Sequence, residues 1–343
     1  MRENYAPWDI KVGDFPRRGS KREKILFILK FAVLAPSGHN SQPWEFIVGD
    51  GFVEVFINLD RSLRKSDPER RQLFLGLGCA IENLTIAADY FGYDCRIIYP
   101  RGDFLDSGVA RIDLIPDLKE VGKDHLIFSI PKRITNRNPY KSDPLSRSFI
   151  DSITNLSNNE IHIDFIEENR KKIALAEIIK KSQIEIMNQK YFRKELSEYI
   201  KSNFTYSKFG MPGFTQGIPG LISFFAPTLI KIINFSKKNE KKDDKLLKLE
   251  TPSFLVVSSK SDRYISRLES GRIFERVWLM GEAEGIKLSP LAAPTQVGNY
   301  WQEVQNILGV EFRPQIVSRI GYCSVDARHT PRFSVEEVII NGA

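Results

Sequence analysis

The chain has 343 residues, of which 42% are hydrophobic and 27% charged, and its formal net charge is +7. This length and composition indicate a globular protein with one large domain or two smaller ones, and they exclude a fibrous or disordered chain. The densest basic run, residues 237–242, is followed at once by Asp243 and Asp244. We interpret it as a solvated loop, so no nucleic-acid partner is predicted.

Hydrophobic periodicity predicts helices and strands along the whole chain. In the N-terminal part the predicted elements are a helix over 21–33, strands over 44–48 and 52–59, a long buried helix over 68–91 that Asp67 caps and Gly92 ends, and strands over 95–99 and 109–114. A polar linker follows Asp117. The C-terminal part is predicted to contain helices over 143–155, 167–200, 263–284 and 295–308, strands over 161–166, 253–258 and 314–322, and an irregular, then basic, segment over 202–248.

The two long central helices share a pattern. Gly92 lies fourteen positions after Gly78, and Gly285 lies fourteen positions after Gly271. In each helix a glutamate lies four residues after the first glycine. The pattern indicates an internal repeat of two related halves; the alternative is a chance likeness of two amphipathic helices.

The cysteines, Cys79, Cys95 and Cys323, are few and widely spaced, which favours a reducing compartment and predicts a cytoplasmic protein. No apolar signal core is present at the N-terminus. Residues 217–235 are largely apolar but contain two prolines and a lysine, so we expect a buried or lid-like segment and no membrane span. With four histidines, no HExxH and no paired cysteines, no metal site is predicted, and no glycine-rich dinucleotide-binding motif follows a strand.

The stretch with the most specific pattern is residues 34–46, Leu-Ala-Pro-Ser-Gly-His-Asn-Ser-Gln-Pro-Trp-Glu-Phe. Pro36 should end the preceding helix, and Gly38 and Asn40 tolerate the tight turn that follows. The turn predicts a cradle of polar atoms suited to the edge of a flat polar ring. It resembles the flavin-contacting Ser-x-x-Asn-x-Gln-Pro-Trp signature of the FMN-dependent nitroreductase superfamily, and its Ser-Gly-His-Asn form looks most like the Acg-type branch.

The resemblance implies an α+β nitroreductase-like fold with mixed or antiparallel sheets. The family's subunits pair around FMN, so two fused halves, residues 1–122 and 123–343, would form an intrachain pseudo-dimer with a lid-like insertion at about 202–248. One FMN per chain and a degenerate second site are expected. The chain would then be a monomer or a weak homodimer.

The resemblance also assigns candidate site residues. Arg133-x-Thr135-x-Arg137 is similar to the family's arginine motif, which would bring Arg133 to the phosphate or ribityl chain and Arg137 to the N1/O2 edge of the flavin. The alternative for this motif is a basic surface turn, and for the cradle histidine a structural role. The expected cofactor-binding residues are Ser37, His39, Asn40, Gln42, Arg133, Thr135, Arg137, Pro290, Leu291 and Ala292 in a loop beside the flavin N5, and Arg328 or Arg332 at the phosphate.

By resemblance the expected activity is an FMN-dependent oxidoreductase. NAD(P)H would deliver hydride and leave, and a nitro, quinone or other electrophilic acceptor would replace it on the same face, a ping-pong order. No catalytic acid or base is demanded, and Arg137 would stabilise the reduced anion. The alternatives are a flavin-sequestering protein whose lid excludes nicotinamide and, on the apolar segment alone, a membrane-associated redox protein.

Overall fold

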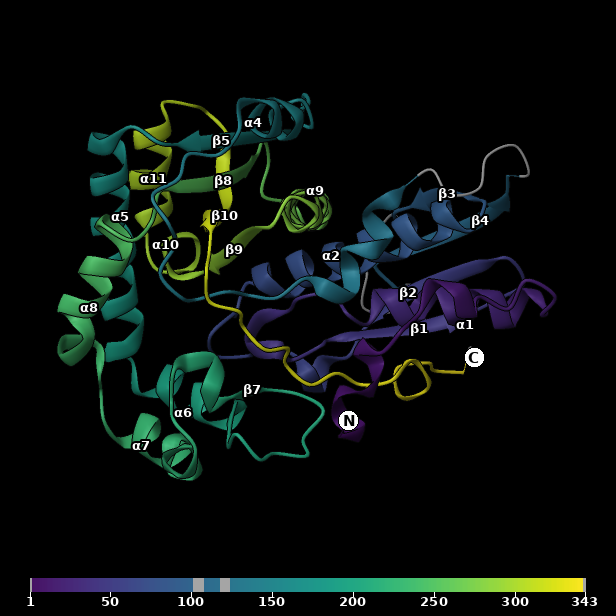
Figure 1. The fold of residues 1–343 in the computed structure, drawn as a ribbon, viewed down its shortest axis with the longest axis horizontal. Coiled ribbons are helices and arrows are strands. Elements are labelled where there is room, and N and C mark those ends of the chain that lie inside the picture. The colour runs from purple at the N-terminus through teal and green to yellow at the C-terminus, as the bar shows by residue number, and fades with distance from the viewer. Residues whose placement is uncertain (1, 101–107, 118–123, 342–343) are drawn as a thin grey trace.

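The computed structural model describes residues 2–100, 108–117 and 124–341. The expected linker after Asp117 and the expected half boundary at residue 122 lie outside these ranges. Two antiparallel sheets lie apart from each other, with the long helices α2 and α9 between them (Figure 1). We refer to the described residues up to 117 as the first half and those from 124 as the second half.

The two sheets have the same strand order. In each, the strands run first, second, fourth, third in the order of the chain, and all pairs are antiparallel. The first sheet consists of β1 (Trp44–Val48), β2 (Phe52–Ile57), β4 (Ala110–Pro116) and β3 (Tyr93–Ile98). The second consists of β5 (Ile161–Ile166), β8 (Ser253–Ser259), β10 (Arg313–Tyr322) and β9 (Ile286–Leu291). In both halves a long helix connects the second strand to the third.

The helices cover the sheets and build the insertion between β5 and β8. They are α1 (Lys21–Ala32), α2 (Arg71–Tyr90), α4 (Arg147–Thr154), α5 (Asn169–Asn188), α6 (Lys190–Tyr199), α7 (Ala226–Ile232), α8 (Ser236–Lys248), α9 (Tyr264–Ala283), α10 (Ala293–Gln296) and α11 (Tyr300–Leu308). Two short strands, β6 (Ile200–Lys201) and β7 (Met211–Pro212), pair within the insertion.

Several predicted helix bounds were wrong for local reasons. Helix α2 begins at Arg71 and not at residue 68, because Arg70 has a left-handed backbone (φ 56°) and the Asp67 carboxylate accepts the Leu73 N–H instead of capping a helix at Pro68. The predicted helix 167–200 is divided at Gln189, whose backbone is extended.

Three further segments differ from the sequence-based prediction. The helix expected from residue 143 begins only at Arg147, where the Ser146 side chain accepts the Phe149 N–H. The helix expected over 295–308 is interrupted near Gly298, which has a positive φ. The basic residues expected in a loop lie in α8, so that interpretation was wrong.

Helices α2 and α9 cross where each has a glycine. A Cβ at Gly78 would lie 2.0 Å from the carbonyl oxygen of Leu268, and a Cβ at Gly271 would lie 2.1 Å from that of Leu75. The contact is reciprocal: Leu268 lies three positions before Gly271, and Leu75 lies three positions before Gly78. Only residues without a Cβ permit this approach, which joins the apolar surfaces of both halves in one core.

The glutamates of the repeated pattern are both buried at this crossing, and each pairs with arginine. Glu82 Oε1 lies 2.5 Å from Arg276 Nε, and Glu275 Oε1 lies 3.1 Å from Arg133 Nε. Buried carboxylates need such partners because desolvation penalises an isolated charge.

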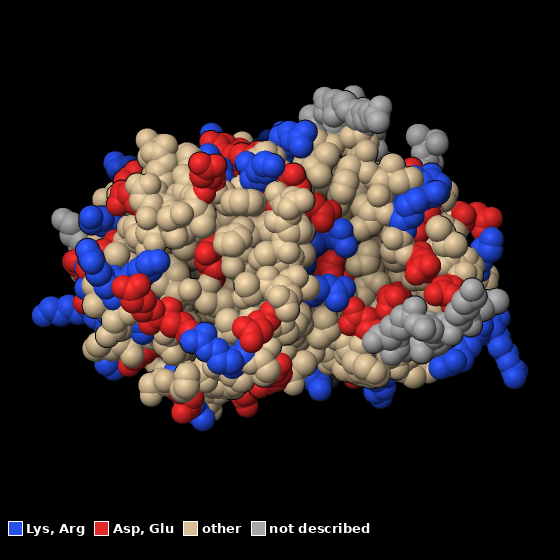
Figure 2. Space-filling model, turned by 90° about the horizontal axis from the view of Figure 1, so that it is seen from above, with Lys and Arg blue, Asp and Glu red and all other residues tan. Residues whose placement is uncertain are grey.

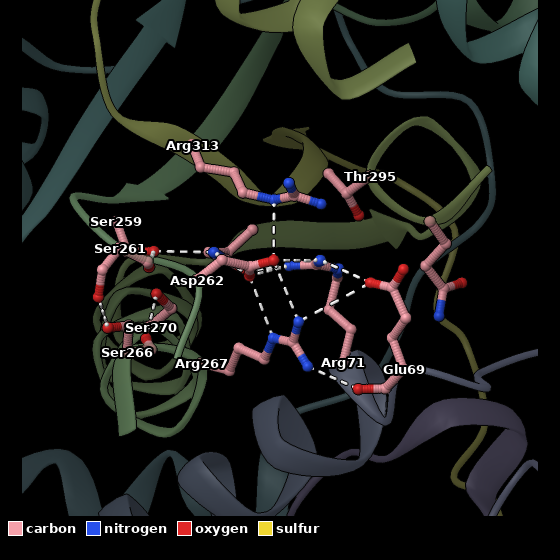
Figure 3. A network of polar contacts seen from close by, with 12 residues as sticks. Glu69, Arg71, Ser259, Ser261, Asp262, Ser266, Arg267, Ser270, Thr295 and Arg313 are labelled. Atoms are coloured by element: carbon pink, nitrogen blue, oxygen red, sulfur yellow. Dashed lines mark hydrogen bonds and ion pairs between the residues drawn. The ribbon is translucent and has the colours of Figure 1, made fainter. Parts of the chain in front are cut away.

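A polar network also joins the halves at the N-terminal ends of α2 and α9 (Figure 3). Asp262 Oδ1 lies 2.6 Å from Arg71 Nη1, and Asp262 Oδ2 lies 3.1 Å from Arg267 and 3.2 Å from Arg313. Although burial alone would raise it, the hydrogen bonds from Arg71 and Arg267 hold the pKa of Asp262 well below its usual value.

The C-terminal tail leaves β10 and crosses to the first half (Figure 1). There it extends the first sheet beside β1, because Phe46 N–H donates to Val338 O at 2.8 Å and Ile340 N–H donates to Phe46 O at 2.9 Å. The segment just before this extension borders the cavity described below.

Charges of both signs mix over the face seen in Figure 2, with no extended area of one sign. Among the described residues one helix, α2, is long and apolar enough to cross a membrane, but 83% of its apolar window is buried inside the protein. Its apolar character is therefore that of a core helix.

Candidate flavin-binding cavity

A cavity of about 750 Å³ lies where the two halves, the insertion and the C-terminal tail meet. Most of the candidate residues predicted from the sequence line it. They are Ser37, His39, Asn40, Arg133, Thr135, Arg137, Pro290, Leu291, Ala292, Arg328 and Arg332. Gln42 is the one candidate that does not line it.

The cradle has an unusual backbone. His39, Asn40 and Gln42 all have left-handed φ angles, of 51°, 56° and 53°. Consecutive left-handed residues other than glycine are uncommon, and such strain concentrates at functional sites. Gly38 does not have a positive φ; a Cβ there would meet the ends of the Gln72 and Leu63 side chains.

The amides of the cradle bind the chain itself. Asn40 Nδ2 donates to the carbonyl oxygens of Gly210 and Pro331, at 3.0 and 2.9 Å. Gln42 Nε2 donates to Lys208 O at 2.7 Å, and its Oε1 accepts the Phe333 N–H at 3.0 Å. Gln42 therefore fastens the insertion and the tail to the cradle, and its predicted contact with the ring edge stays a prediction.

Arg133 and Arg332 border the cavity, but both are buried and bind the chain itself through part of their guanidiniums. Arg133 Nη2 donates to Leu34 O at 2.7 Å besides the ion pair of its Nε with Glu275. Arg332 donates to Asn40 Oδ1 and to the carbonyl of Ala35, at 2.5 and 3.1 Å. These arginines hold the backbone that enters the cradle. The Nε atoms of both are buried without a hydrogen-bond partner among the described residues, although Arg133 Nε forms the ion pair with Glu275.

Arg137 and Arg328 are different, because both are exposed and both line the cavity. Among the described residues, neither guanidinium has a hydrogen-bond or ion-pair partner; Arg328 lies over the Phe214 ring, 3.9 Å from its centroid. Both guanidiniums are therefore available to an anionic ligand in the cavity.

Two histidines of the cavity are neutral at pH 7. Burial lowers the pKa of His39 to about 4, and its Nε2 is buried without a hydrogen-bond partner. Burial lowers the pKa of His329 to about 3; its ring stacks on Trp8 at 3.9 Å. Neutral imidazoles with an unpaired nitrogen can exchange a hydrogen bond with a polar ligand.

Burial raises the pKa of Glu275 to about 7, against the opposing effect of Arg133. The core around Arg133 therefore carries less negative charge than a carboxylate with an ordinary pKa would give it.

Residues 288–292, expected in a loop, instead end strand β9. Pro290 pairs with Ser318 and Leu291 with Val317 of β10, and Ala292 directly precedes α10. Proline is tolerated here because β9 is an edge strand of its sheet. The strand fixes the backbone of this wall more firmly than a loop would.

The insertion supplies one wall of the cavity; the sequence predicted a lid-like insertion over about 202–248 but did not identify which of its residues line the cavity. Met211 and the turn Phe214–Gly217 line the cavity, and Lys242 and Leu246 of α8 line it from the same insertion. No sequence signal pointed to them, because the hydrogen bonds to Asn40 and Gln42 that bring this segment to the cradle use its backbone. Among the described residues, no three His, Cys, Asp or Glu side chains gather as a metal site.

No family model matches the chain. A curated protein of Mycobacterium tuberculosis H37Rv named "Putative NAD(P)H nitroreductase" is 25% identical over 333 residues, which are 92% of this chain and 91% of the relative. "Putative NAD(P)H nitroreductase acg" of the same organism is 25% identical over 326 residues, 90% of this chain and 93% of the relative. The crystal structure of a protein from Anabaena variabilis described as a putative nitroreductase matches 93% of this chain and 91% of its own, with a TM-score of 0.55 and 11% identity. The predicted α+β fold of the nitroreductase type and the Acg-type resemblance are thereby confirmed.

Proposed function

We propose that this chain, which is similar over nine tenths of its length to proteins named NAD(P)H nitroreductases, is an FMN-dependent oxidoreductase that takes electrons from NAD(P)H. The observation that carries the proposal is a pair of guanidiniums, Arg137 and Arg328, that have no hydrogen-bond or ion-pair partner among the described residues and line a cavity that also contains the nitroreductase-type cradle. FMN has a phosphate dianion at one end and a ring edge that gains negative charge on reduction, so it needs two cationic contacts.

The residues present fit such a cofactor. A cavity of about 750 Å³ has the size typical of cofactor sites. Its walls provide apolar side chains such as Leu75, Phe274 and Trp278 for the flat ring, beside the unpaired Nε2 of His39 and the free guanidinium of Arg137. The fit supports one FMN per chain.

We assign the roles as follows. Arg137 would contact the pyrimidine edge of the flavin, where its positive charge would hold the pKa of the reduced ring low. Arg328 would contact the phosphate. Arg133 and Arg332 would act indirectly by holding the cradle backbone, since their donors bind Leu34, Ala35 and the cradle. His39, neutral at pH 7, would hydrogen-bond the ring through Nε2 without adding charge. When bound, FMN supplies the two-electron transfer between nicotinamide and an electrophilic acceptor such as a nitro compound or quinone.

The two halves support the proposal that one chain forms the site that two subunits form elsewhere. Both sheets have the same strand order, and the glycines of α2 and α9 face each other reciprocally. We therefore propose an intrachain pseudo-dimer that needs no second subunit to complete the cavity. The three cysteines are free thiols, in accord with the proposed cytoplasmic location.

A second candidate function rests on the insertion. Because Met211 and Phe214–Gly217 line the cavity and their segment is fastened to Asn40, the insertion could exclude nicotinamide from a bound flavin. The protein would then sequester FMN with little turnover.

The test is FMN titration of the apoprotein, followed by quenching of flavin fluorescence. We expect one site per chain, and Arg137→Gln should weaken FMN binding about tenfold or more, the size of one charge-assisted hydrogen bond. Arg147→Gln, at an exposed arginine outside the cavity, is the matched control and should bind FMN as the wild type does. Equal affinities of all three proteins would refute the assigned role of Arg137.

A further inference from the structure

The chain exposes a group of large apolar side chains at one corner of the molecule. The corner is formed by α7 and the turn before it, which lie far from both sheets (Figure 1). Leu221, Phe225 and Ile232 are 75%, 67% and 69% exposed. What we call the apolar corner comprises Leu221, Ile222, Phe224, Phe225, Ile232 and Ile233. Residues 217–235 were expected to be buried or lid-like; burial does not hold for most of this segment.

The apolar corner is ordered without being covered. The Phe224 ring stacks on Phe204 with 5.4 Å between centroids, and the Ser223 hydroxyl donates to Gly220 O and accepts the Asn203 N–H. Exposed apolar areas of this kind, held in place by polar contacts beneath them, mark interaction surfaces.

The segment that carries the apolar corner contains no acidic residue. From Tyr199 to Asn239 the chain contains no Asp or Glu, while it contains five lysines, at 201, 208, 231, 237 and 238. Lys231 is exposed on α7 and has no ion-pair partner among the described residues. An apolar tip in an acid-free, lysine-containing segment complements an anionic lipid surface, which offers hydrocarbon beneath negative headgroups.

A second copy of the chain fits this surface less well. In a two-fold dimer the same patch faces itself, so Lys231 of one copy would approach Lys231 of the other with no acidic residue of the segment to separate them. Burying like charges together opposes association, whereas anionic headgroups would neutralise them.

We propose that the protein docks peripherally on anionic membranes through the apolar corner. Phe225, Ile232 and their neighbours would enter the boundary between headgroups and acyl chains, and Lys231 would lie among the headgroups. In this arrangement none of the described helices crosses the bilayer. Docking in this way would bring the cavity wall formed by Phe214–Gly217, which directly precedes the corner, close to the membrane surface.

The experiment is flotation of the whole protein with vesicles of phosphatidylcholine and phosphatidylglycerol in equal parts, compared with vesicles of phosphatidylcholine alone. We expect the protein to float with the anionic vesicles and to remain largely unbound with the neutral ones. Phe225→Ser combined with Ile232→Ser should lower the partition coefficient at least about tenfold. Lys231→Glu should weaken binding to the anionic vesicles only, and added salt should do the same.

The matched control is Ile98→Ser combined with Ile115→Ser, which removes two exposed isoleucines (41% and 47% exposed) from the first sheet. It should float as the wild type does, and the thermal midpoints of both double variants should show that each is folded. Wild-type protein that stays unbound with anionic vesicles would overturn the proposal, as would equal losses in the two double variants. A concentration-dependent dimer that only Phe225→Ser with Ile232→Ser abolishes, without vesicle binding, would assign the corner to a second copy instead. None of these readouts depends on bound flavin.

Discussion

The close crossing of α2 and α9 predicts that a glycine-to-alanine change there lowers the free energy of unfolding, although the same change usually stabilises a helix. Replacing glycine by alanine inside an exposed helix stabilises it by about 1 kcal/mol, because alanine loses less backbone entropy on folding. At Gly78 the added Cβ would lie 2.0 Å from Leu268 O, which is backbone of the other helix and cannot rotate away. We therefore expect Gly78→Ala to destabilise the protein in spite of its better helix propensity.

The magnitude follows from the overlap. Restoring a contact of 3 Å or more requires the two helix backbones to separate by about 1 Å, across a crossing packed at crystal-like density. Overpacking of cores costs about 1–3 kcal/mol of stability. We expect a cost at the upper end of this range, because the atom in the way is a backbone carbonyl oxygen. After the propensity gain, the free energy of unfolding should fall by about 2 kcal/mol. Gly271→Ala should do the same, because its Cβ would meet Leu75 O at 2.1 Å.

The assay is urea unfolding, with Gly13→Ala as the control because nothing lies within 4 Å of a Cβ at that position. The control should keep the wild-type free energy of unfolding within about 0.5 kcal/mol. If Gly78→Ala or Gly271→Ala proved as stable as the control, or more stable, the close approach of the two helices would be refuted.

Three further predictions follow from buried polar groups. The pKa of His39 in the folded protein, about 4, lies below its value of about 6.5 in the unfolded chain. The unfolded chain therefore binds the proton first, and the free energy of unfolding should fall as pH drops from about 6.5 to 4. In His39→Asn the free energy of unfolding should depend less on pH, and an unchanged dependence would contradict the buried neutral imidazole. At pH 8, where Glu275 is mostly ionised, Glu275→Gln should lower the free energy of unfolding by about 3 kcal/mol, because Arg133 would stay buried without its ion-pair partner. A loss below about 1 kcal/mol in urea unfolding would argue against this ion pair. Gln42→Ala removes the hydrogen bond to Lys208 O and should speed amide hydrogen exchange in residues 205–213, and exchange at the wild-type rate would show that other contacts hold the insertion.

Much of the fold could be predicted because local chemistry agrees with it. The capping box at Ser20 and Glu23 begins α1, and glycines with positive φ, Gly92 and Gly285, follow α2 and α9. Periodicity located α1, α2, α9 and most strands to within a few residues. Strand β9 was missed because its Ser-Pro sequence is typical of a loop, and only pairing with β10 makes it a strand.

The site was predicted as a set of residues and not as a set of contacts. A sequence motif identifies which side chains lie at the site. Whether a hydrogen-bond donor of the site stays free depends on its tertiary partners, which the spacing of residues in the sequence does not reveal. Arg133 and Arg137 are two residues apart in one motif, yet the first is buried against Glu275 and the second is free in the cavity. The insertion wall at Phe214 likewise depends on backbone hydrogen bonds, which carry no signal in side-chain patterns.

The central claim is that the cavity holds one FMN and passes electrons from NAD(P)H to an acceptor. The most direct measurement is the anaerobic visible spectrum of the protein loaded with FMN, before and after addition of NADPH or NADH. We predict about one FMN per chain, bleached by one of the nicotinamides and restored by a quinone or nitro compound. Bound FMN that resists both nicotinamides and yields only to dithionite would establish the sequestering function instead, and failure to bind FMN at all would contradict both.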